Sequence, residues 1–424
     1  MQQFTFRYGD GEVTANLDEK QILGVLQGNK VAPIDDISRA LAETLEEPVD
    51  SRPLREIVNG EMKIALIVSD MSRFWMRQDK VVPPLLDFLR KYGVRDENIV
   101  ILIACGTHAG GNERELRMLV TDEVFERVRV VNHDCRADDL VYLGMTAHKT
   151  PVWINRIAAE ADLVICLGAA VHHVMAGFGG GRKSILPGIS GMETIKHNHA
   201  YSLDPKILRS NPRIGNGKLK DNPLNDDMCE AAAMMPNLFM INLVMNAEMQ
   251  LARIIAGHQQ TSWLAACREA DRIFRVPIAE KADAIITSCG GYPKDMSLYQ
   301  GTKTIDNVES GLKPGGTLIL IIEARDGGGA AEYFDWIRDW TAGTIEKRLR
   351  DHFTVPGYIF FLNCEQAQRY RIFLLTSLAQ ETVAPMGLRA FQSMDELLEA
   401  ADLKGKSLYV IPNGATVIPD PEEK

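Results

Sequence analysis

The stretch that decides the fold is KIALIVSD at residues 63–70, a short unbroken apolar run that ends in Ser69 and Asp70. The same pattern recurs at residues 98–104, 128–131 and 161–167. Helical patterns separate these runs, at residues 81–92 and 113–120. Continuous apolar strands that alternate with helices are typical of a parallel sheet covered on both faces. We therefore predict an α/β fold with a mainly parallel sheet.

A second series of apolar runs begins near residue 275, and it indicates a second α/β domain. Strands are expected at residues 281–288, 317–322, 358–362, 371–376 and 407–411. A helix is expected over residues 298–312, where KPGG at residues 313–316 would end it. The 424 residues fit two domains. We place them at residues 1–272 and 273–424, with the active-site cleft between them.

Composition excludes several classes of protein. Acidic residues outnumber basic ones by 57 to 47, a balance that argues against nucleic acid as a partner. The longest apolar runs fall short of the roughly 18 residues of a membrane span, and the N-terminus does not resemble a signal peptide. The seven cysteines are widely spaced, as in a reducing compartment. We expect a cytoplasmic protein without a membrane partner.

The segment HHVMAGFGGGRKS, residues 172–184, is the densest cluster of chemically active residue types. It directly follows a predicted strand, and ligands in such sheets bind beyond the carboxyl ends of the strands. The glycines, Gly179, Gly180 and Gly181 among them, allow a ligand to approach the backbone closely, and Arg182 and Lys183 add positive charge. These features predict a phosphate cradle; a glycine-rich turn without a ligand is the alternative.

The same segment nearly matches the P-loop motif, which would indicate a kinase or nucleotide hydrolase. Arg182 occupies the position of the second glycine, however, and Pro187 would break the helix that the motif requires. A phosphate-binding kinase or nucleotide hydrolase is therefore kept only as an alternative from another class.

Several polar residues follow predicted strands and are candidates for chemistry. Asp70 and Arg73 follow the first strand, and His108 follows the second. His197 and His199 are two residues apart, so on an extended segment they point to opposite faces and one of them would serve the site. The other isolated histidines, His133 among them, are expected to be surface or core residues.

Gln300 and Lys303 form a candidate anion site in the second domain. They are three residues apart on a predicted helix and so share one face. An amide and an ammonium on one face can bind an anion across a cleft that Asp70 and Arg73 line from the first domain. A solvated helix face is the alternative.

Together these segments resemble the nickel-pincer lactate racemase family, over about residues 63–305. The resemblance rests on matches to DMSR at residues 70–73, GTH at 106–108, HVMAGF at 173–178, GGRKSILPG at 180–188 with Asn198-His199, and GYP at 291–293 with Tyr299, Gln300 and Lys303. It implies two α/β domains around a nickel-pincer nucleotide. That cofactor is a pyridinium-3-thioamide-5-thiocarboxylic acid mononucleotide whose sulfurs and ring carbon hold nickel.

The resemblance also implies a role for each matched residue. Lys183 would be tethered covalently to the cofactor, and His199 would ligate nickel. His108 and His173 would be the two acid/base residues. The remaining residues would line the cofactor and substrate pocket: Asp70, Arg73, Gln300 and Lys303, with Arg73, Gln300 and Lys303 binding substrate.

The implied reaction is racemisation or epimerisation at C2 of a 2-hydroxy acid, by reversible hydride transfer to the cofactor. Histidine titrates near neutral pH, so one histidine on each side of the substrate can exchange the hydroxyl proton of one enantiomer. Ala109 stands where the family usually has arginine, which leaves room for a substrate larger than lactate. A sugar-acid (aldonate) epimerase of the same family is thus an alternative. Enzymes that synthesise the cofactor are the expected partners in maturation.

Overall fold

The structure is a computed structural model that describes residues 1–421, and it consists of two compact units. The N-terminal unit comprises Lys30–Tyr201 and Pro212–Ile273. The C-terminal unit comprises Met1–Asn29, Ser202–Asn211 and the chain from Phe274. The grouping differs from the continuous ranges 1–272 and 273–424, because strand β3 (Ile22–Val25) pairs in parallel with β19 (Leu408–Ile411).

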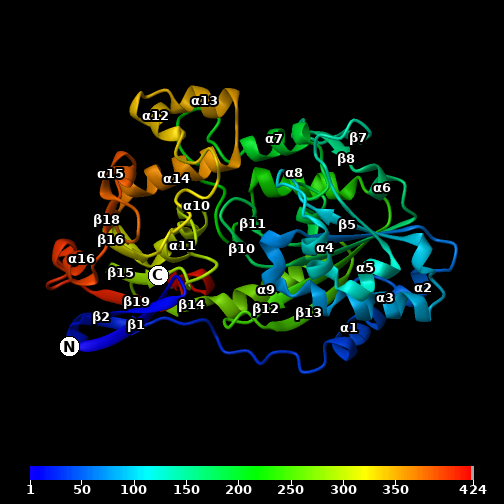
Figure 1. The fold of residues 1–424 in the computed structure, drawn as a ribbon, viewed down its shortest axis with the longest axis horizontal. Helices are drawn as coiled ribbons and strands as arrows, with labels where there is room; N and C mark the ends of the chain where they lie inside the picture. Colours follow the sequence, from blue (N-terminus) through cyan, green and yellow to red (C-terminus); the bar gives the residue numbers. More distant parts are fainter. Residues whose placement is uncertain (422–424) are drawn as a thin grey trace. The chain divides into compact units, whose positions relative to one another are not determined.

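The N-terminal unit contains a six-stranded sheet in the order β13-β12-β9-β4-β5-β6. Figure 1 labels its strands β5, β12 and β13. Its strands are β4 (Ile64–Ser69), β5 (Ile99–Ala104), β6 (Arg129–Asn132), β9 (Leu163–Ala169), β12 (Leu238–Met245) and β13 (Leu251–Gly257). Neighbouring strands are parallel except β13, which is antiparallel to β12. The four predicted strands and the mainly parallel sheet are confirmed.

Helices cover this sheet because its strands are apolar on both faces. The helices are α1 (Ile37–Glu46), α2 (Leu54–Ile57), α3 (Val82–Lys91), α4 (Glu113–Val120), α5 (Asp122–Arg127), α6 (Arg156–Ala159), α7 (Met192–Ala200), α8 (Pro223–Ala233) and α9 (Thr261–Phe274). One hydrophobic cluster joins Leu45 of α1, Leu85 of α3 and Leu119 of α4 to Ile101 of β5. Burial of these side chains is the main force that holds the helices to the sheet.

The strand order puts the candidate residues at one edge of the sheet. The chain forms β4 first, then adds β5 and β6 on one side and β9 and β12 on the other. The loops that follow β4 and β9 therefore diverge, and in open α/β sheets ligands bind at such a switch point. Residues that follow β4, β5 and β9 all lie at the carboxyl edge, as predicted.

The C-terminal unit contains a second six-stranded sheet, in the order β18-β17-β16-β15-β19-β3, and all of its strand pairs are parallel. Its other strands are β15 (Ala282–Ser288), β16 (Leu312–Ile321), β17 (Arg371–Leu375) and β18 (Arg389–Phe391). The hairpin of β1 (Gln2–Tyr8) and β2 (Gly11–Leu17) packs Phe6 and Leu17 into the same cluster as Leu397 of α16 (Met394–Ala401).

One predicted element of this unit is wrong, and another is helical as predicted but interrupted. Residues 358–362 belong to helix α14 (Val355–Arg369), which begins where the Thr354 side chain accepts a hydrogen bond from the Gly357 amide. The predicted helix at residues 298–312 is divided into α10 (Leu298–Gly301) and α11 (Lys303–Val308), and β16 begins at Leu312. At the break, the Thr302 hydroxyl bonds the Leu298 carbonyl and so competes with the helical backbone.

Smaller elements complete the fold. They are the helices α12 (Trp336–Thr341), α13 (Ile345–Asp351) and α15 (Gln380–Val383), and the strand pairs β7 (Val141–Met145) with β8 (Pro151–Ile154), β10 (His172–His173) with β11 (Gly177–Phe178), and β14 (Arg275–Ile278) with β20 (Ile418–Pro421). Within residues 1–421, every helix is too short or too polar to cross a membrane.

Candidate active site

Asp70 and His108 form a close pair at the carboxyl edge of the first sheet. His108 Nδ1 lies 2.5 Å from Asp70 Oδ2, and the other oxygen, Oδ1, accepts hydrogen bonds from the amide and hydroxyl of Ser72. Burial disfavours the Asp70 carboxylate, but the bonds from His108 and Ser72 and the nearby Arg73 bring its pKa below the usual value. Asp70 is thus an acceptor, so Nδ1 of His108 carries the proton and Nε2 presents a lone pair.

His173 and Lys183 form a second pair in the loops after β9. Lys183 Nζ lies 2.9 Å from His173 Nε2. The amides of Met175 and Ala176 donate to His173 Nδ1 at 3.2 and 3.3 Å. Nδ1 thus accepts from two amides, and the Lys183 ammonium, which can only donate, faces Nε2. Donors therefore surround both ring nitrogens of His173, whereas a carboxylate holds His108.

His199 lies on α7 and is buried, with 5% of its surface exposed. Its Nδ1 lies 3.1 Å from the carbonyl of Ile195, one helical turn earlier, and donates to it. Burial, with the positive charge of Lys183, lowers the pKa of His199 to about 3. The ring is therefore neutral with an available Nε2, which is the form that binds a metal.

The histidine pair at residues 197–199 is helical, not extended as the sequence predicted. Two residues along a helix span about 200°, so the two side chains still point in nearly opposite directions. His197 is exposed and His199 is buried. One of the two side chains therefore points inward, for a different geometric reason, and that His199 serves the site stays a prediction.

The glycine-rich loop packs against the protein itself. Gly181 has a φ of +52°, and a Cβ atom there would lie 2.5 Å from the Trp263 ring. A Cβ atom on Gly180 would lie 2.8 Å from the carbonyl oxygen of Ala169. The amide of Gly179 donates to the Val171 carbonyl. The contacts at Gly180 and Gly181 require glycine whether or not a ligand binds.

Arg182 is not a free positive charge for a phosphate, contrary to the expectation from sequence. Its guanidinium is buried and donates to the carbonyls of Ala176 and Phe178 and to the Asn225 side chain. It also stacks 3.8 Å from the Trp263 ring. Residues 181–184 form one short 3-10 turn, so the helix that a P-loop needs after its lysine is absent from this described segment.

Gln300 and Lys303 lie together in the C-terminal unit, across the break between α10 and α11. Lys303 Nζ donates to Gln300 Oε1 at 2.9 Å and lies 4.4 Å from the centre of the Tyr299 ring. Their predicted common face is confirmed. In the N-terminal unit, the Arg73 guanidinium donates to the carbonyl and hydroxyl oxygens of Ser72.

Two pairings escaped the sequence analysis. Asp70 and His108 were identified separately, although parallel pairing of β4 with β5, Ser69 opposite Ala104, brings their loops together. The second pairing joins His172 to Asp271 on α9, with 2.7 Å between His172 Nε2 and Asp271 Oδ1. Only the first pairing had a signal in the sequence, namely a carboxylate and a histidine after neighbouring strands.

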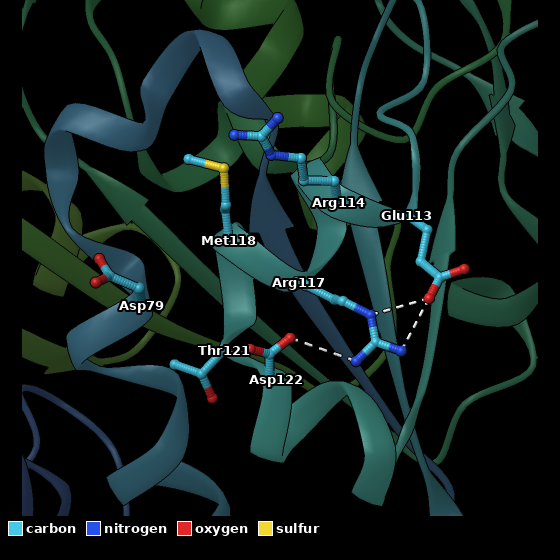
Figure 2. Close-up of a pocket in the computed structure, with 7 residues that line it drawn as sticks. All are labelled: Asp79, Glu113, Arg114, Arg117, Met118, Thr121 and Asp122. Atoms are coloured by element: carbon cyan, nitrogen blue, oxygen red, sulfur yellow. Dashed lines mark hydrogen bonds and ion pairs between the residues drawn. The ribbon is translucent and has the colours of Figure 1, made fainter.

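A surface hollow elsewhere in the N-terminal unit is lined by residues of other segments (Figure 2). Its lining residues are Asp79, Glu113, Arg114, Arg117, Met118, Thr121 and Asp122. Arg117 forms ion pairs with Glu113 and Asp122. Exposed pairs of this kind contribute little energy, and no residue predicted for the site lies among the seven.

Comparisons with known proteins agree with this fold and identify a family. Residues 8–209 match the family model described as the lactate racemase N-terminal domain, and residues 278–419 match the lactate racemase C-terminal domain. The lactate racemase of Thermoanaerobacterium thermosaccharolyticum is 30% identical, with 97% of each chain covered. The lactate racemase of Lactiplantibacillus plantarum is 28% identical, with 97% of this chain and 98% of that protein covered.

Solved structures resemble the chain over nearly its whole length. The lactate racemase apoprotein from T. thermosaccharolyticum gives a TM-score of 0.89 at 28% identity, covering 99% of this chain and 100% of that one. A Thermotoga maritima protein gives a TM-score of 0.64 at 18% identity, covering 94% and 100%, and shares the fold. The protein is thus an α/β isomerase. More closely, the chain belongs to the lactate racemase family.

Proposed function

We propose that this racemase inverts C2 of a 2-hydroxy acid, lactate or a larger relative, with a nickel-pincer nucleotide tethered to Lys183. The observation that carries the proposal is the neighbourhood of Lys183. Its amine lies 2.9 Å from the ring of His173, and its charge acts on the buried, neutral His199. An amine nucleophile, an acid/base group and a metal-binding imidazole thus meet in one place.

The donor set fits a cofactor that brings most of its own metal ligands. Within residues 1–421, no group of three or more His, Cys, Asp and Glu side chains could hold a metal ion. A single imidazole, that of His199, suits the one remaining position of a square-planar nickel. Lys183 can form a covalent tether because an amine condenses with an acyl group. The loop with Gly179, Gly180 and Gly181 would approach the nucleotide.

The two histidines would handle the hydroxyl proton of the substrate. When bound, the cofactor supplies an electrophilic carbon that takes up and returns the C2 hydrogen as hydride. His108 presents a lone pair on Nε2 because Asp70 holds its Nδ1 proton. Once the tether removes the positive charge of Lys183, His173 would carry a proton on Nε2, because its Nδ1 accepts from two backbone amides. One ring can thus accept a proton while the other holds one, and the roles exchange for the opposite enantiomer.

Cationic and amide side chains would bind the substrate carboxylate. Arg73 offers a planar pair of donors, and Lys303 with Gln300 offers an ammonium and an amide. Ala109, next to His108, is small and exposed, which favours a substrate longer than lactate, such as a sugar acid. A kinase or nucleotide hydrolase is not proposed, because Arg182 is committed to its own loop. Maturation would need the cofactor-synthesis enzymes as partners, in the cytoplasm.

The test combines mass, metal content and isotope transfer. The chain is co-expressed with pincer-synthesis enzymes and assayed against a panel of chiral 2-hydroxy acids in D₂O. We expect nickel, a mass increment on the peptide with Lys183, and a product that retains protium at C2, with a primary isotope effect for C2-deuterated substrate. Stoichiometric deuterium at C2 would exclude hydride transfer. An unmodified Lys183 in active, nickel-containing protein would exclude the tether.

A further inference from the structure

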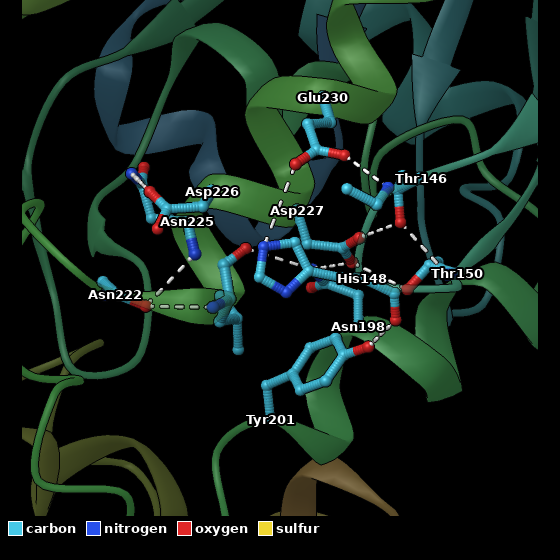
Figure 3. A network of polar contacts seen from close by, with 12 residues as sticks. Thr146, His148, Thr150, Asn198, Tyr201, Asn222, Asn225, Asp226, Asp227 and Glu230 are labelled. Atoms are coloured by element: carbon cyan, nitrogen blue, oxygen red, sulfur yellow. Dashed lines mark hydrogen bonds and ion pairs between the residues drawn. The ribbon is translucent and has the colours of Figure 1, made fainter.

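Helix α8 (Pro223–Ala233) carries none of the candidate site residues, yet three of its polar residues hold segments that do. Figure 3 shows these three residues, with Asn198 of α7 beside them. These residues are Asn222, which caps the helix, Asn225 and Asp227. All three are buried, with exposures of 0%, 6% and 0%. Buried polar side chains cost free energy unless they are hydrogen-bonded, so their partners indicate what they hold in place.

Asn222 and Asn225 bind the two loops that follow β9. Asn222 Nδ2 donates to the carbonyl of Met175, two residues after His173, at 2.9 Å. Arg182, which directly precedes Lys183, donates from Nε to Asn225 Oδ1 at 3.1 Å. The start of α8 therefore fixes the backbone beside His173 and beside Lys183.

Asp227 binds the residue that precedes His199. Its Oδ2 accepts hydrogen bonds from Asn198 Nδ2 at 2.8 Å and from the Thr150 hydroxyl at 2.9 Å. Its Oδ1 accepts one from the Thr146 hydroxyl at 2.5 Å. Asn198 Nδ2 also donates to the Leu224 carbonyl of α8. Two acceptors of α8 thus hold the last turn of α7.

These three donors to the buried carboxylate are neutral. A carboxylate inside a protein is costly, and an apolar residue of similar size would often be more favourable for stability alone. The carboxylate instead fixes the relative positions of two segments, because their three donors must all point at its oxygens. Asp227 therefore has the properties of a residue that sets geometry.

The contacts of Asn198 with α8 restrict the rotation of α7 about its own axis. A side chain that ends about 6 Å from the axis moves by about 1 Å when a helix turns by about 10°. Displacements of this size are enough to weaken a catalytic arrangement. His199 already uses its Nδ1 on its own helix, so the orientation of α7 determines where Nε2 points.

We propose that α8 positions His173, Lys183 and His199 relative to one another through Asn222, Asn225 and Asp227, and that Asp227 aims the imidazole of His199. Asp227 is a positioning residue that acts through Asn198. The inference rests on the proposed role of His199 as the nickel ligand.

The test uses Asp227→Asn and Asn198→Ala, with Thr194→Val as the matched control. Asparagine at position 227 keeps only one acceptor oxygen for the three donors, so the link to Asn198 is weakened, and Asn198→Ala removes it. Thr194 is on the same helix, is fully buried, and donates to the Pro151 carbonyl at 2.6 Å. Its substitution removes a buried hydrogen bond from α7 without touching the Asn198–Asp227 contact.

The first measurement is the rate at which a chelator removes nickel from co-expressed, folded protein. We expect removal to be at least about tenfold faster in Asp227→Asn and Asn198→Ala than in wild type, as for other outer partners of a metal ligand. The mass increment on Lys183 should persist. Thr194→Val should keep its nickel even if its melting temperature falls as much as that of the two test variants. Equal nickel retention in the three variants would overturn the inference.

The second measurement needs neither metal nor cofactor. In the metal-free chain, the histidine ring signal of His199 is identified by its loss in His199→Gln. We expect this signal to shift in Asp227→Asn and Asn198→Ala and to stay in place in Thr194→Val; an unchanged signal in both test variants would refute the positioning role. If His199→Gln retains nickel as wild type does, the proposed function fails instead, which separates the two outcomes.

Discussion

The Nδ1 atom of His108 lies 2.5 Å from Oδ2 of Asp70, although the two residues follow different strands. The contact gives the two histidines of the site opposite character. His108 is held by a carboxylate and presents a lone pair, whereas His173 faces donors on both ring nitrogens, two backbone amides at Nδ1 and Lys183 at Nε2. The proposed reaction needs a proton acceptor on one side of the substrate and a proton source on the other, so the different partners of the two rings bear directly on that proposal.

Asp70→Asn should lower kcat strongly. An asparagine amide would donate to Nδ1 and reverse the tautomer of His108, which removes the basic Nε2. We expect a loss of about 10²–10⁴-fold, the usual scale of acid/base catalysis, while nickel content stays at the wild-type value. Asp79→Asn is the control, because Asp79 pairs with Arg77 and not with a histidine. Full activity in Asp70→Asn would show that the pair has no part in proton transfer.

The same substitution should have a pH-dependent effect on stability. The folded-state pKa of Asp70 is below its ordinary value, so the folded chain binds fewer protons at this site than the unfolded chain does. The contribution of the Asp70 carboxylate to the free energy of unfolding is complete above about pH 4. It disappears as the pH falls through the lowered pKa of the folded state. Urea unfolding should show wild type more stable than Asp70→Asn by about 1 kcal/mol at pH 6, discounted because His108 is half exposed. The difference should shrink towards pH 3; a growing difference would contradict the assignment.

Gly181→Ala should destabilise the N-terminal unit far more than Gly343→Ala destabilises the C-terminal unit. Both glycines have positive φ, +52° and +69°, so both substitutions carry a backbone cost of about 1 kcal/mol. Only at Gly181 would the new Cβ atom also meet a buried ring, that of Trp263, at 2.5 Å. Thermal unfolding of the two variants measures the difference. Equal losses would show that the loop has more room than its contacts indicate.

Arg182→Met should cost about 3–5 kcal/mol in the free energy of unfolding, because it leaves two carbonyls and the Asn225 amide without their donor. Burial lowers the pKa of Arg182 to about 10, so the group is still charged at neutral pH. Arg95→Met, which removes an exposed pair with Glu97, should cost less than about 1 kcal/mol. Urea titrations compare the two. A similar cost for both would mean that the buried guanidinium does not hold the loop.

Lys303→Ala should raise KM for the 2-hydroxy acid by about tenfold or more and leave nickel content unchanged, since it removes a cation proposed for the substrate carboxylate. Lys347→Ala is the control on the same unit, because Lys347 pairs with Asp351 on an exposed helix face. Steady-state kinetics on co-expressed protein supply the measurement. An unchanged KM would remove Lys303 from the substrate site.

The sequence was informative wherever hydrophobic periodicity decides structure. The strands β4, β5 and β9 are continuous apolar runs with polar residues directly after them, and parallel pairing then places those residues at one edge. The failure at residues 358–362 has the same origin. Ile359, Phe360, Phe361 and Leu362 are all buried in α14, and a helix buried on every side has no period that distinguishes it from a strand.

The candidate site was predictable as a set of residues, and its geometry was not. Nothing in the order of residues 179–184 distinguishes an arginine that binds a phosphate from one that bonds its own loop. The distinction depends on Trp263 and Asn225, which are distant in sequence. The same holds for Asp227, whose three donors come from residues 146–198 and meet only in the folded chain.

The pairing of β3 with β19 has a consequence for synthesis on the ribosome. Residues 22–25 leave the ribosome first, but the strand they pair with, Leu408–Ile411, is among the last segments made. Closing so long a loop is slow, because the chain between the two strands must lose conformational entropy before the strands can pair. The N-terminal unit, whose strands lie within residues 64–257, can complete its sheet while the ribosome is still adding the rest. The first strand of the C-terminal sheet must therefore wait for nearly the whole protein to be made before it acquires its neighbour.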